Sequence, residues 1–292
     1  MSVLRDARGV PQGGVGWSMK FNLKPFTTET QRHRENLELP TCSVWCWNYI
    51  FLLPFLCVSV SLWWIVMNYF VTGTDTGVGK TLISCALLHA FAAQGKHVVG
   101  MKPLAAGCDE DGVNADVKQL RAASNVLATF GQINPYSFLQ PIAPHIAARN
   151  AGVRIELARL LNSYRELTSQ AEVVIVEGAG GFCVPLNDKQ TSADLVKELN
   201  VPVILVVGMR LGCLNHALLT VRAIADYQLE CAGWVANVLD ADMPALTENI
   251  EALRERIAAP LLGVVPYQAT PDAQVAAQHL NLSLLECNRT NE

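Results

Sequence analysis

The pattern of apolar positions changes near residue 67. From there to residue 292, short runs rich in β-branched residues alternate with segments in which apolar residues recur every three or four positions. Several short runs are apolar at successive positions, which is typical of strands buried on both faces of a parallel sheet. Strands are predicted at 68–72, 97–101, 172–177, 201–208, 232–238 and 261–265, and helices near 79–94, 115–128, 154–170, 192–199, 214–228 and 243–257. This alternation predicts an α/β domain with a doubly wound, mostly parallel sheet, which binds ligands at the carboxyl ends of its strands.

The first 66 residues have a different pattern. No charged residue occurs between Glu38 and Asp75, and residues 44–66 form an apolar run long enough to span a bilayer. However, the first predicted strand begins directly after this run and leaves almost no linker between a bilayer and the domain. We therefore expect a domain at 67–292 that begins at Met67, with residues 1–66 as an extension outside the fold, either translated upstream sequence that is not part of the native protein or an arm, and not a membrane anchor. A membrane-anchored ATPase is the alternative if the run is a true span.

Composition and charge narrow the classes of function. Hydrophobic residues make up 51% of the chain and charged residues 16%, which excludes intrinsic disorder. A formal net charge of -4 gives no electrostatic reason to expect nucleic-acid binding. The nine cysteines show neither zinc-finger spacing nor a disulfide framework. We therefore expect reduced thiols, as in a cytoplasmic protein.

The strongest motif follows the first predicted strand. Residues 73–81 read GTDTGVGKT and open the first predicted helix. Glycines allow backbone N–H groups to surround phosphate oxygens, Lys80 would reach the β- and γ-phosphates, and the Thr81 hydroxyl would hold Mg²⁺. The first glycine stands one position earlier than in the usual motif, so this loop is one residue longer. The motif predicts a domain of the P-loop nucleoside triphosphate hydrolase type.

Three further residues are expected at the same edge of the sheet. Glu177 ends an apolar strand and precedes glycines, where a carboxylate can bind Mg²⁺. Lys102 ends the second strand, where a second ammonium group can stabilise a transferring phosphoryl group, although a solvated lysine also fits that position. Asp116 begins a helix as a second candidate magnesium ligand, and an aspartate that interacts with the helix dipole fits equally well.

A glycine loop at residues 211–216 follows the fourth predicted strand and leads into a helix. Such a loop can bind an anion, and a carboxylate suits it. His216 lies in this segment without a carboxylate partner or a nucleophile motif nearby, so we interpret it as structural.

In this order, the motifs resemble those of the dethiobiotin synthetase family. The resemblance covers about residues 67–285. It is carried by the phosphate loop, Lys102-Pro103, Asn134-Pro135-Tyr136, Pro144-His145, VEGAGG at 176–181, LGCLNHA at 211–217 and GWVAN at 233–237. It implies a homodimeric, ATP-dependent cyclo-ligase of biotin biosynthesis that converts 7,8-diaminononanoate, CO₂ and MgATP to dethiobiotin, ADP and phosphate. The implied intermediates are a carbamate and then a carbamic-phosphoric anhydride.

The resemblance also implies roles for individual residues. Lys80 and Lys102 would be catalytic, and Mg²⁺ would be held by Thr81, Asp116 and Glu177. The implied nucleotide-binding residues are Gly77, Val78, Gly79, Lys80, Thr81, Leu82, Asp116, Glu177, Gly178, Ala179, Gly180, Asn237, Val238, Pro266, Tyr267, Gln268 and Asp272. The implied substrate-binding residues are Thr76, Lys102, Ala106, Leu211, Gly212, Cys213, Leu214 and Asn215, of which the last five would bind the substrate carboxylate across the dimer interface.

The chain departs from the family pattern at two positions. Gly77 stands where some members have an acidic residue, and Ala106 stands where a serine that contacts substrate is expected. The missing hydroxyl removes one neutral hydrogen bond, worth about 0.5–1.5 kcal/mol. We expect weaker binding of the diamine with the chemistry retained.

Two other functions are compatible with a P-loop domain. A partition or septum-placement ATPase switch carries a signature lysine early in the loop, where this chain has Asp75. An amide ligase that acts on a corrinoid acid needs a source of ammonia, such as a fused glutaminase domain. The sequence contains no nucleophile motif for such a domain. Both alternatives therefore fit the sequence less well.

The predicted boundary at Met67 can be tested by deletion. Removing residues 1–66 is expected to leave a folded, active protein, because the repeating α/β pattern begins after them. Thermal unfolding and ATP-dependent turnover of both forms check this expectation, and fractionation separates the membrane-anchored alternative. Loss of folding on deletion would show that the boundary is misplaced.

Overall fold

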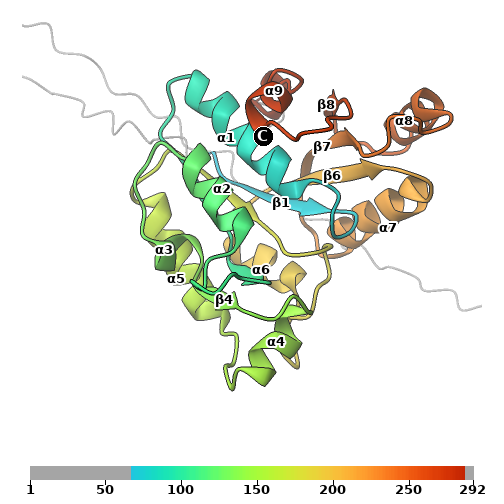
Figure 1. The fold of residues 1–292 in the computed structure, drawn as a ribbon. Coiled ribbons are helices and arrows are strands. Elements are labelled where there is room, and N and C mark those ends of the chain that lie inside the picture. Colours follow the sequence, from blue (N-terminus) through green and yellow to red (C-terminus); the bar gives the residue numbers. More distant parts are fainter. Residues whose placement is uncertain (1–66, 287–292) are drawn as a thin grey trace, which may run out of the picture. The chain divides into compact units, whose positions relative to one another are not determined.

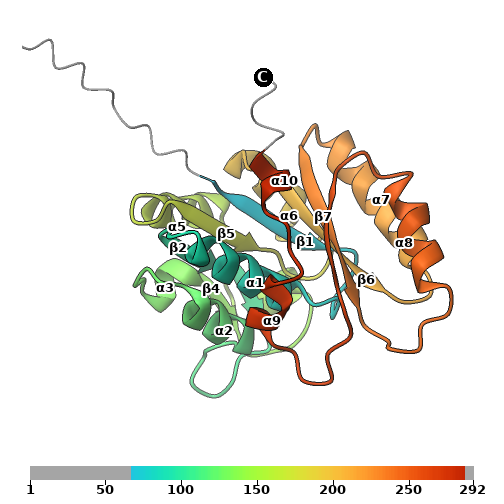
Figure 2. The ribbon, with the colours of Figure 1, turned by 90° about the horizontal axis from the view of Figure 1, so that it is seen from above.

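The computed structural model describes residues 67–286. Its main sheet has six strands, all parallel, in the order β2-β5-β1-β6-β7-β8, of which Figure 1 labels β1, β6, β7 and β8 and Figure 2 labels β2 and β5. These strands are β1 (Tyr69–Gly73), β2 (Val98–Met101), β5 (Val173–Glu177), β6 (Val203–Met209), β7 (Cys231–Val238) and β8 (Leu261–Val265). The chain runs from β1 to one side through β2 and β5, and to the other side through β6, β7 and β8. This is the predicted doubly wound fold, and it opens a crevice at the carboxyl end of β1.

Helices cover both faces of the sheet. They include α1 (Lys80–Ala93), α5 (Leu157–Thr168), α6 (Ser192–Leu199), α7 (Cys213–Asp226), α8 (Leu246–Arg254) and α9 (Ala273–Ala277). Tyr69 and Val71 pack into a cluster with α1 and α9, whereas Phe70 packs into a cluster with α5 and α6. Figure 1 shows α1 and α9 on one side of β1 and α6 and α7 on the other, and Figure 2 shows α7 and α8 side by side. Burial on both faces explains the continuous apolar runs.

The sequence pattern did not predict a small insert between β2 and β5. Here β3 (Leu104–Ala106) pairs in parallel with β4 (Tyr136–Phe138), and α3 (Phe130–Ile133) and α4 (Pro144–Asn150) flank β4. Elements this short carry too few residues to show a period. Asn134 fastens the insert to the end of β2, since its amide donates to the carbonyls of Lys102 (2.6 Å) and Tyr136 (3.0 Å). The short helices α9 and α10 (Ser283–Glu286) were also not predicted.

The predicted end of the helix near 115–128 is wrong. The helix observed there, α2 (Ala115–Ala123), ends five residues earlier. The hydroxyl of Ser124 accepts from the Gly100 N–H (3.0 Å), and the Asn125 side chain accepts from the Val98 N–H (2.7 Å). These contacts satisfy donors of the edge strand β2 and compete with continuation of the helix. The other predicted strands and helices are confirmed, with ends that differ by at most three residues.

Met67 already belongs to the folded sheet layer, since its N–H donates to the carbonyl of Glu172 (3.1 Å). The predicted extension at 1–66, with its apolar run at 44–66, lies outside the described residues, as do residues 287–292. The boundary at Met67 therefore stays a prediction. Between residues 67 and 286, none of the helices combines the length and apolar character needed to cross a membrane.

Candidate active site

The phosphate loop joins β1 to α1 and bends through two glycines. Gly77 and Gly79 have φ angles of 74° and 89°, in the left-handed region that favours glycine. Backbone N–H groups in turns of this kind form concavities that bind anions. Because α1 begins at Lys80, its N-terminus adds partial positive charge. The loop is therefore suited to the anionic end of a nucleotide.

Val78 and Asn237 hold the second half of this loop against the sheet. Val78 is buried, and a Cβ atom on Gly73 or Gly208 would collide with its side chain. The Asn237 amide donates to the Val78 carbonyl (2.9 Å), and a Cβ atom on Gly79 would overlap that amide nitrogen. The second half of the loop is therefore anchored to β1, β6 and β7.

Lys102 brings two carboxylates together beside the loop. Its ammonium, with 4% of the residue exposed, donates to Asp116 Oδ2 (2.9 Å) and Glu177 Oε1 (2.5 Å). The same Glu177 oxygen accepts from the Thr81 hydroxyl (2.9 Å). The structure therefore brings together residues from α1, α2 and the ends of β2 and β5, all of which the sequence placed at one edge.

Opposite charges govern the ionisation of this cluster. Burial disfavours a charged Lys102, but Glu177 and Asp116 outweigh burial and raise the pKa of the ammonium above its ordinary value. Burial also opposes ionisation of Asp116, and Lys102 overcomes this effect, so that the pKa of the carboxyl is lowered. Lys102 and Asp116 are therefore both charged near neutral pH.

Lys80 has a different environment. It is buried, and its ammonium donates to the carbonyl of Asp75 in the same loop (2.8 Å). Burial, followed by the neighbouring Lys102 ammonium, lowers the pKa of Lys80 to about 8. An anionic phosphate would counteract both effects, since it favours the charged form. The ammonium of Lys80 is thus suited to pair with a bound triphosphate.

These groups line a cavity of about 810 Å³, within the usual range for ligand sites. The predicted residues on its wall are Thr76, Gly77, Gly79, Lys80, Thr81, Lys102, Ala106, Asp116, Glu177, Ala179 and Gly180. Asn114 and the segment 141–144 also line it and were missed by sequence reasoning. The apolar segment 141–144 belongs to the insert, and only its last residue, Pro144, falls in a motif of the resemblance, which gave it no role in the site.

Asn114 positions Asp116 directly. Its side chain caps α2 by accepting from the Asp116 N–H (2.9 Å), and its amide donates to the carbonyls of Ala106 (3.2 Å) and Gly107 (3.1 Å). An asparagine just before a predicted helix is an ordinary N-cap signal, so sequence reasoning could have identified it.

The residues assigned to the nucleotide base lie further along the same sheet edge. Asn237 pairs in register with Val265, so that the ends of β7 and β8 are adjacent. Val238 is the last residue of β7, and Pro266, Tyr267 and Gln268 follow β8. Asp272 caps α9, because its carboxylate accepts from two N–H groups of that helix. None of these residues lines the 810 Å³ cavity.

The segment assigned to the substrate carboxylate is also outside that cavity. Leu211 and Gly212 follow β6, and Cys213 begins α7. Leu211 is 99% exposed, whereas the Cys213 side chain is buried in the core. Only the backbone of Cys213 is therefore suited to contact a ligand. Leu214 and Asn215 continue in the first turn of the helix.

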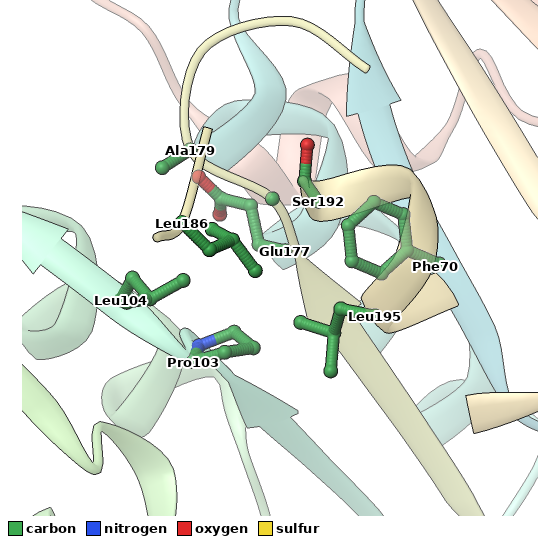
Figure 3. A pocket seen from close by; sticks show the side chains of 9 residues that line it. Phe70, Pro103, Leu104, Glu177, Ala179, Leu186, Ser192 and Leu195 are labelled. Carbon is green, nitrogen blue, oxygen red and sulfur yellow. The ribbon is translucent and has the colours of Figure 1, made fainter. Parts of the chain in front are cut away.

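Glu177 also borders a second, small cavity of about 10 Å³ (Figure 3). Its Oε2 atom is buried and has no hydrogen-bond partner among the described residues. Phe70, Leu104 and Leu195 give this cavity apolar walls, and the Ser192 hydroxyl donates to the Phe182 carbonyl instead. Burying a carboxylate oxygen without a hydrogen-bond donor costs free energy, because the oxygen loses its contacts with water. Oε2 is therefore suited to coordinate a cation.

The oxygen atoms of Thr81, Asp116 and Glu177 form the type of donor set that Mg²⁺ prefers. Residues 67–286 contain no cluster of three or more His, Cys, Asp or Glu side chains that could hold a metal. A magnesium ion here would therefore depend on a hydroxyl and on phosphate oxygens besides two carboxylates, which is the usual way in which Mg²⁺ binds with nucleotides. The residues present fit that ion.

The chain is similar to several known proteins. Residues 67–275 match the model of a family described as an AAA domain. ATP-dependent dethiobiotin synthetase BioD of Nitrosospira multiformis is 56% identical over 216 residues, which cover 74% of this chain and 95% of the relative. The same enzyme of Aromatoleum aromaticum is 55% identical over 213 residues, covering 72% and 95%. Among solved structures, the cell division ATPase MinD of Pyrococcus furiosus has a TM-score of 0.47 at 16% identity, covering 78% of this chain and 100% of that one.

Replacing Gly79 with alanine tests the packing of the loop. We expect Gly79→Ala to lower the free energy of unfolding by at least about 1–2 kcal/mol, because alanine is strained at this φ angle and its Cβ would displace Asn237. Chemical denaturation and ADP titration measure the loss of stability and of nucleotide binding.

Gly131 on α3 offers a matched control, since it has open space around its Cα and no positive φ angle. Gly131→Ala is expected to leave ADP binding unchanged and to stabilise the protein by about 0.4–1 kcal/mol. Equal behaviour of the two variants would contradict the role given to Gly79.

Proposed function

This chain belongs to the ATP-dependent dethiobiotin synthetase family, and we propose that it closes the ureido ring of dethiobiotin from 7,8-diaminononanoate, CO₂ and ATP in biotin biosynthesis. The observation that carries the proposal is the 56% identity to a relative of that name over 95% of the relative's length. The cavity in which two lysines and two carboxylates meet a phosphate loop supports the proposal.

The first step joins CO₂ to one amine of the diamine. The amine nitrogen attacks the CO₂ carbon and releases a proton to solvent, which leaves a carbamate anion. Lys102 would stabilise this anion, and its two carboxylate partners keep it protonated for that role. Lys102 is therefore assigned as a catalytic residue.

The second step transfers the γ-phosphoryl group. A carbamate oxygen attacks the γ-phosphorus, the bond to the β-phosphate oxygen breaks, and ADP leaves. Lys80, as the second catalytic residue, would stabilise charge on the phosphate oxygens together with the N–H groups of residues 77–82, including Val78 and Leu82. Gly178, Ala179 and Gly180, after β5, allow close approach of the nucleotide. The product is a carbamic-phosphoric anhydride.

The last step closes the ring. The second amine attacks the anhydride carbonyl, the bond to phosphate oxygen breaks, and inorganic phosphate leaves as the amine loses its proton. Most of the catalysis in this sequence comes from orientation and charge stabilisation, because no residue of the chain forms a covalent intermediate.

Thr81, Asp116 and Glu177 would hold Mg²⁺, with the unpartnered Oε2 of Glu177 as an available ligand. The ion supplies positive charge to the β- and γ-phosphate oxygens when it is bound. For the base of ATP, we assign Asn237, Val238 and the residues Pro266, Tyr267, Gln268 and Asp272.

The diamine would lie between the front of the phosphate loop and Lys102, against Thr76 and Ala106. We assign its carboxylate to the backbone of residues 211–215, at the N-terminus of the 14-residue helix α7. Because this segment does not line the cavity of its own chain, the partner protomer of a homodimer would supply it. The substrates are small molecules of the cytoplasm, and the proposal needs no nucleic acid and no membrane.

Replacing Lys102 tests the proposed chemistry. We expect Lys102→Ala to lower kcat by about 10²–10³, because the variant lacks a charge that stabilises the transition state. The assay follows phosphate release and ring-closed product with ATP, bicarbonate and the diamine. Lys118→Ala is the control, since Lys118 lies on α2 and pairs with Asp109 at the surface. Near-normal turnover of Lys102→Ala, or wild-type protein without ring-closed product, would refute the assignment.

Replacing Glu177 tests the magnesium site. Glu177→Gln is expected to raise the half-saturating Mg²⁺ concentration by about 10–100-fold, because the amide is a weaker ligand than a carboxylate. The measurement is an Mg²⁺ titration of turnover and of ADP binding. Glu172→Gln serves as the control, because Glu172 lies just before β5 at the opposite end of the strand and pairs with Lys96. An unchanged Mg²⁺ dependence in Glu177→Gln would rule out Glu177 as a ligand.

A further inference from the structure

The side chain of Arg210 reaches the front half of the phosphate loop. Its guanidinium lies 2.5 Å from the Asp75 carboxylate, and the other carboxylate oxygen accepts from the Thr76 N–H (2.7 Å). The carbonyl of Asp75 in turn accepts from Lys80 (2.8 Å). Asp75 therefore connects Arg210 to two residues that line the 810 Å³ cavity.

The backbone of Arg210 belongs to another part of the proposed site. Arg210 follows β6, and its carbonyl accepts from the Cys213 N–H (3.0 Å) at the start of α7. Gly212, with a φ angle of 94°, completes this turn. The Arg210–Asp75 pair thus links the front of the phosphate loop to the turn at residues 211–213.

The two halves of the phosphate loop are held differently. Val78 and Asn237 fix the second half against the sheet, and Gly79 leads into α1. In the first half, the Thr74 N–H still bonds to the Val206 carbonyl, after which Thr76 and Gly77 are exposed. The Arg210–Asp75 ion pair contacts this exposed half of the loop, because the Asp75 carboxylate also accepts from the Thr76 N–H.

We propose that Arg210 is a positioning residue that acts through Asp75 to hold Thr76 and Gly77 in the conformation that receives the diamine. This inference rests on the proposed function for its kinetic consequence, but not for the conformation of the loop. Both side chains are about half exposed, at 44% and 46%, so the pair adds little to the stability of the fold. Its effect is expected in the geometry of the site.

The test uses the full chain with Arg210→Gln, Arg210→Lys, Asp75→Asn and the double variant Asp75→Asn/Arg210→Gln. Arg222→Gln is the matched control, because Arg222 forms an exposed ion pair with Asp226 on α7 (3.1 Å). Each protein is assayed for KM of the diamine, kcat, Kd of MgADP and amide hydrogen exchange of residues 74–77 and of α1.

In Arg210→Gln, we expect the KM of the diamine to rise by about tenfold or more, with the Kd of MgADP within about threefold of wild type. Exchange at residues 74–77 should accelerate, while exchange in α1 stays unchanged. In Arg210→Lys, the KM of the diamine and the exchange at residues 74–77 should stay close to wild type, because lysine retains the positive charge. The double variant should be no worse than either single variant, as expected for two residues that act as a pair.

An unchanged KM and unchanged exchange in Arg210→Gln would overturn the inference, as would additive losses in the double variant or an equal response of Arg222→Gln. If the wild-type protein forms no dethiobiotin, the proposed function fails. In that case the exchange of residues 74–77 in Arg210→Gln still decides the inference, since it needs no substrate.

Discussion

The rest of the site depends on the ion pairing of the buried Lys102 ammonium with Asp116 and Glu177. Removing an ion from water costs roughly several kcal/mol, and here Asp116 and Glu177 offset that cost at 2.9 and 2.5 Å. Since one carboxylate comes from α2 and the other from β5, a single cation fixes that helix against the end of the sheet. The Thr81 hydroxyl donates a hydrogen bond to Glu177 and thereby connects α1 to the same group of residues. Loss of Lys102 would leave the Glu177 carboxylate buried without a counter-charge, whereas Asp116 is partly exposed.

The same cluster gives the two lysines different electrostatic properties. Lys102 has its counter-charges within the protein, and its pKa is raised. Lys80 bonds to a neutral carbonyl, and burial together with Lys102 lowers its pKa to about 8. An incoming anion therefore stabilises the charge of Lys80 more than that of Lys102, because Lys102 is already neutralised. A bound nucleotide would thus complete the charge balance of the cavity.

Much of this arrangement could be predicted because it depends on local patterns. Strands such as β6 are continuous apolar runs, and residues such as Lys102 and Glu177 stand at the carboxyl ends of strands, which share one edge of the sheet. The insert with β3 and β4 could not be predicted, since three-residue strands show no period and depend on tertiary contacts such as those of Asn134. The partner of Asp75 was also hidden, because Arg210 lies on a distant segment that only the folded sheet brings near.

Position 75 explains how this loop differs from that of a partition-type ATPase. Such proteins place their second lysine in the loop, whereas this chain has an aspartate there. A free carboxylate at this point would repel a triphosphate, but Arg210 balances its charge. The second ammonium group comes instead from Lys102 at the end of β2, where two carboxylates hold it. The positive charge is thereby moved from a loop to a buried part of the sheet edge, where two carboxylates fix its position.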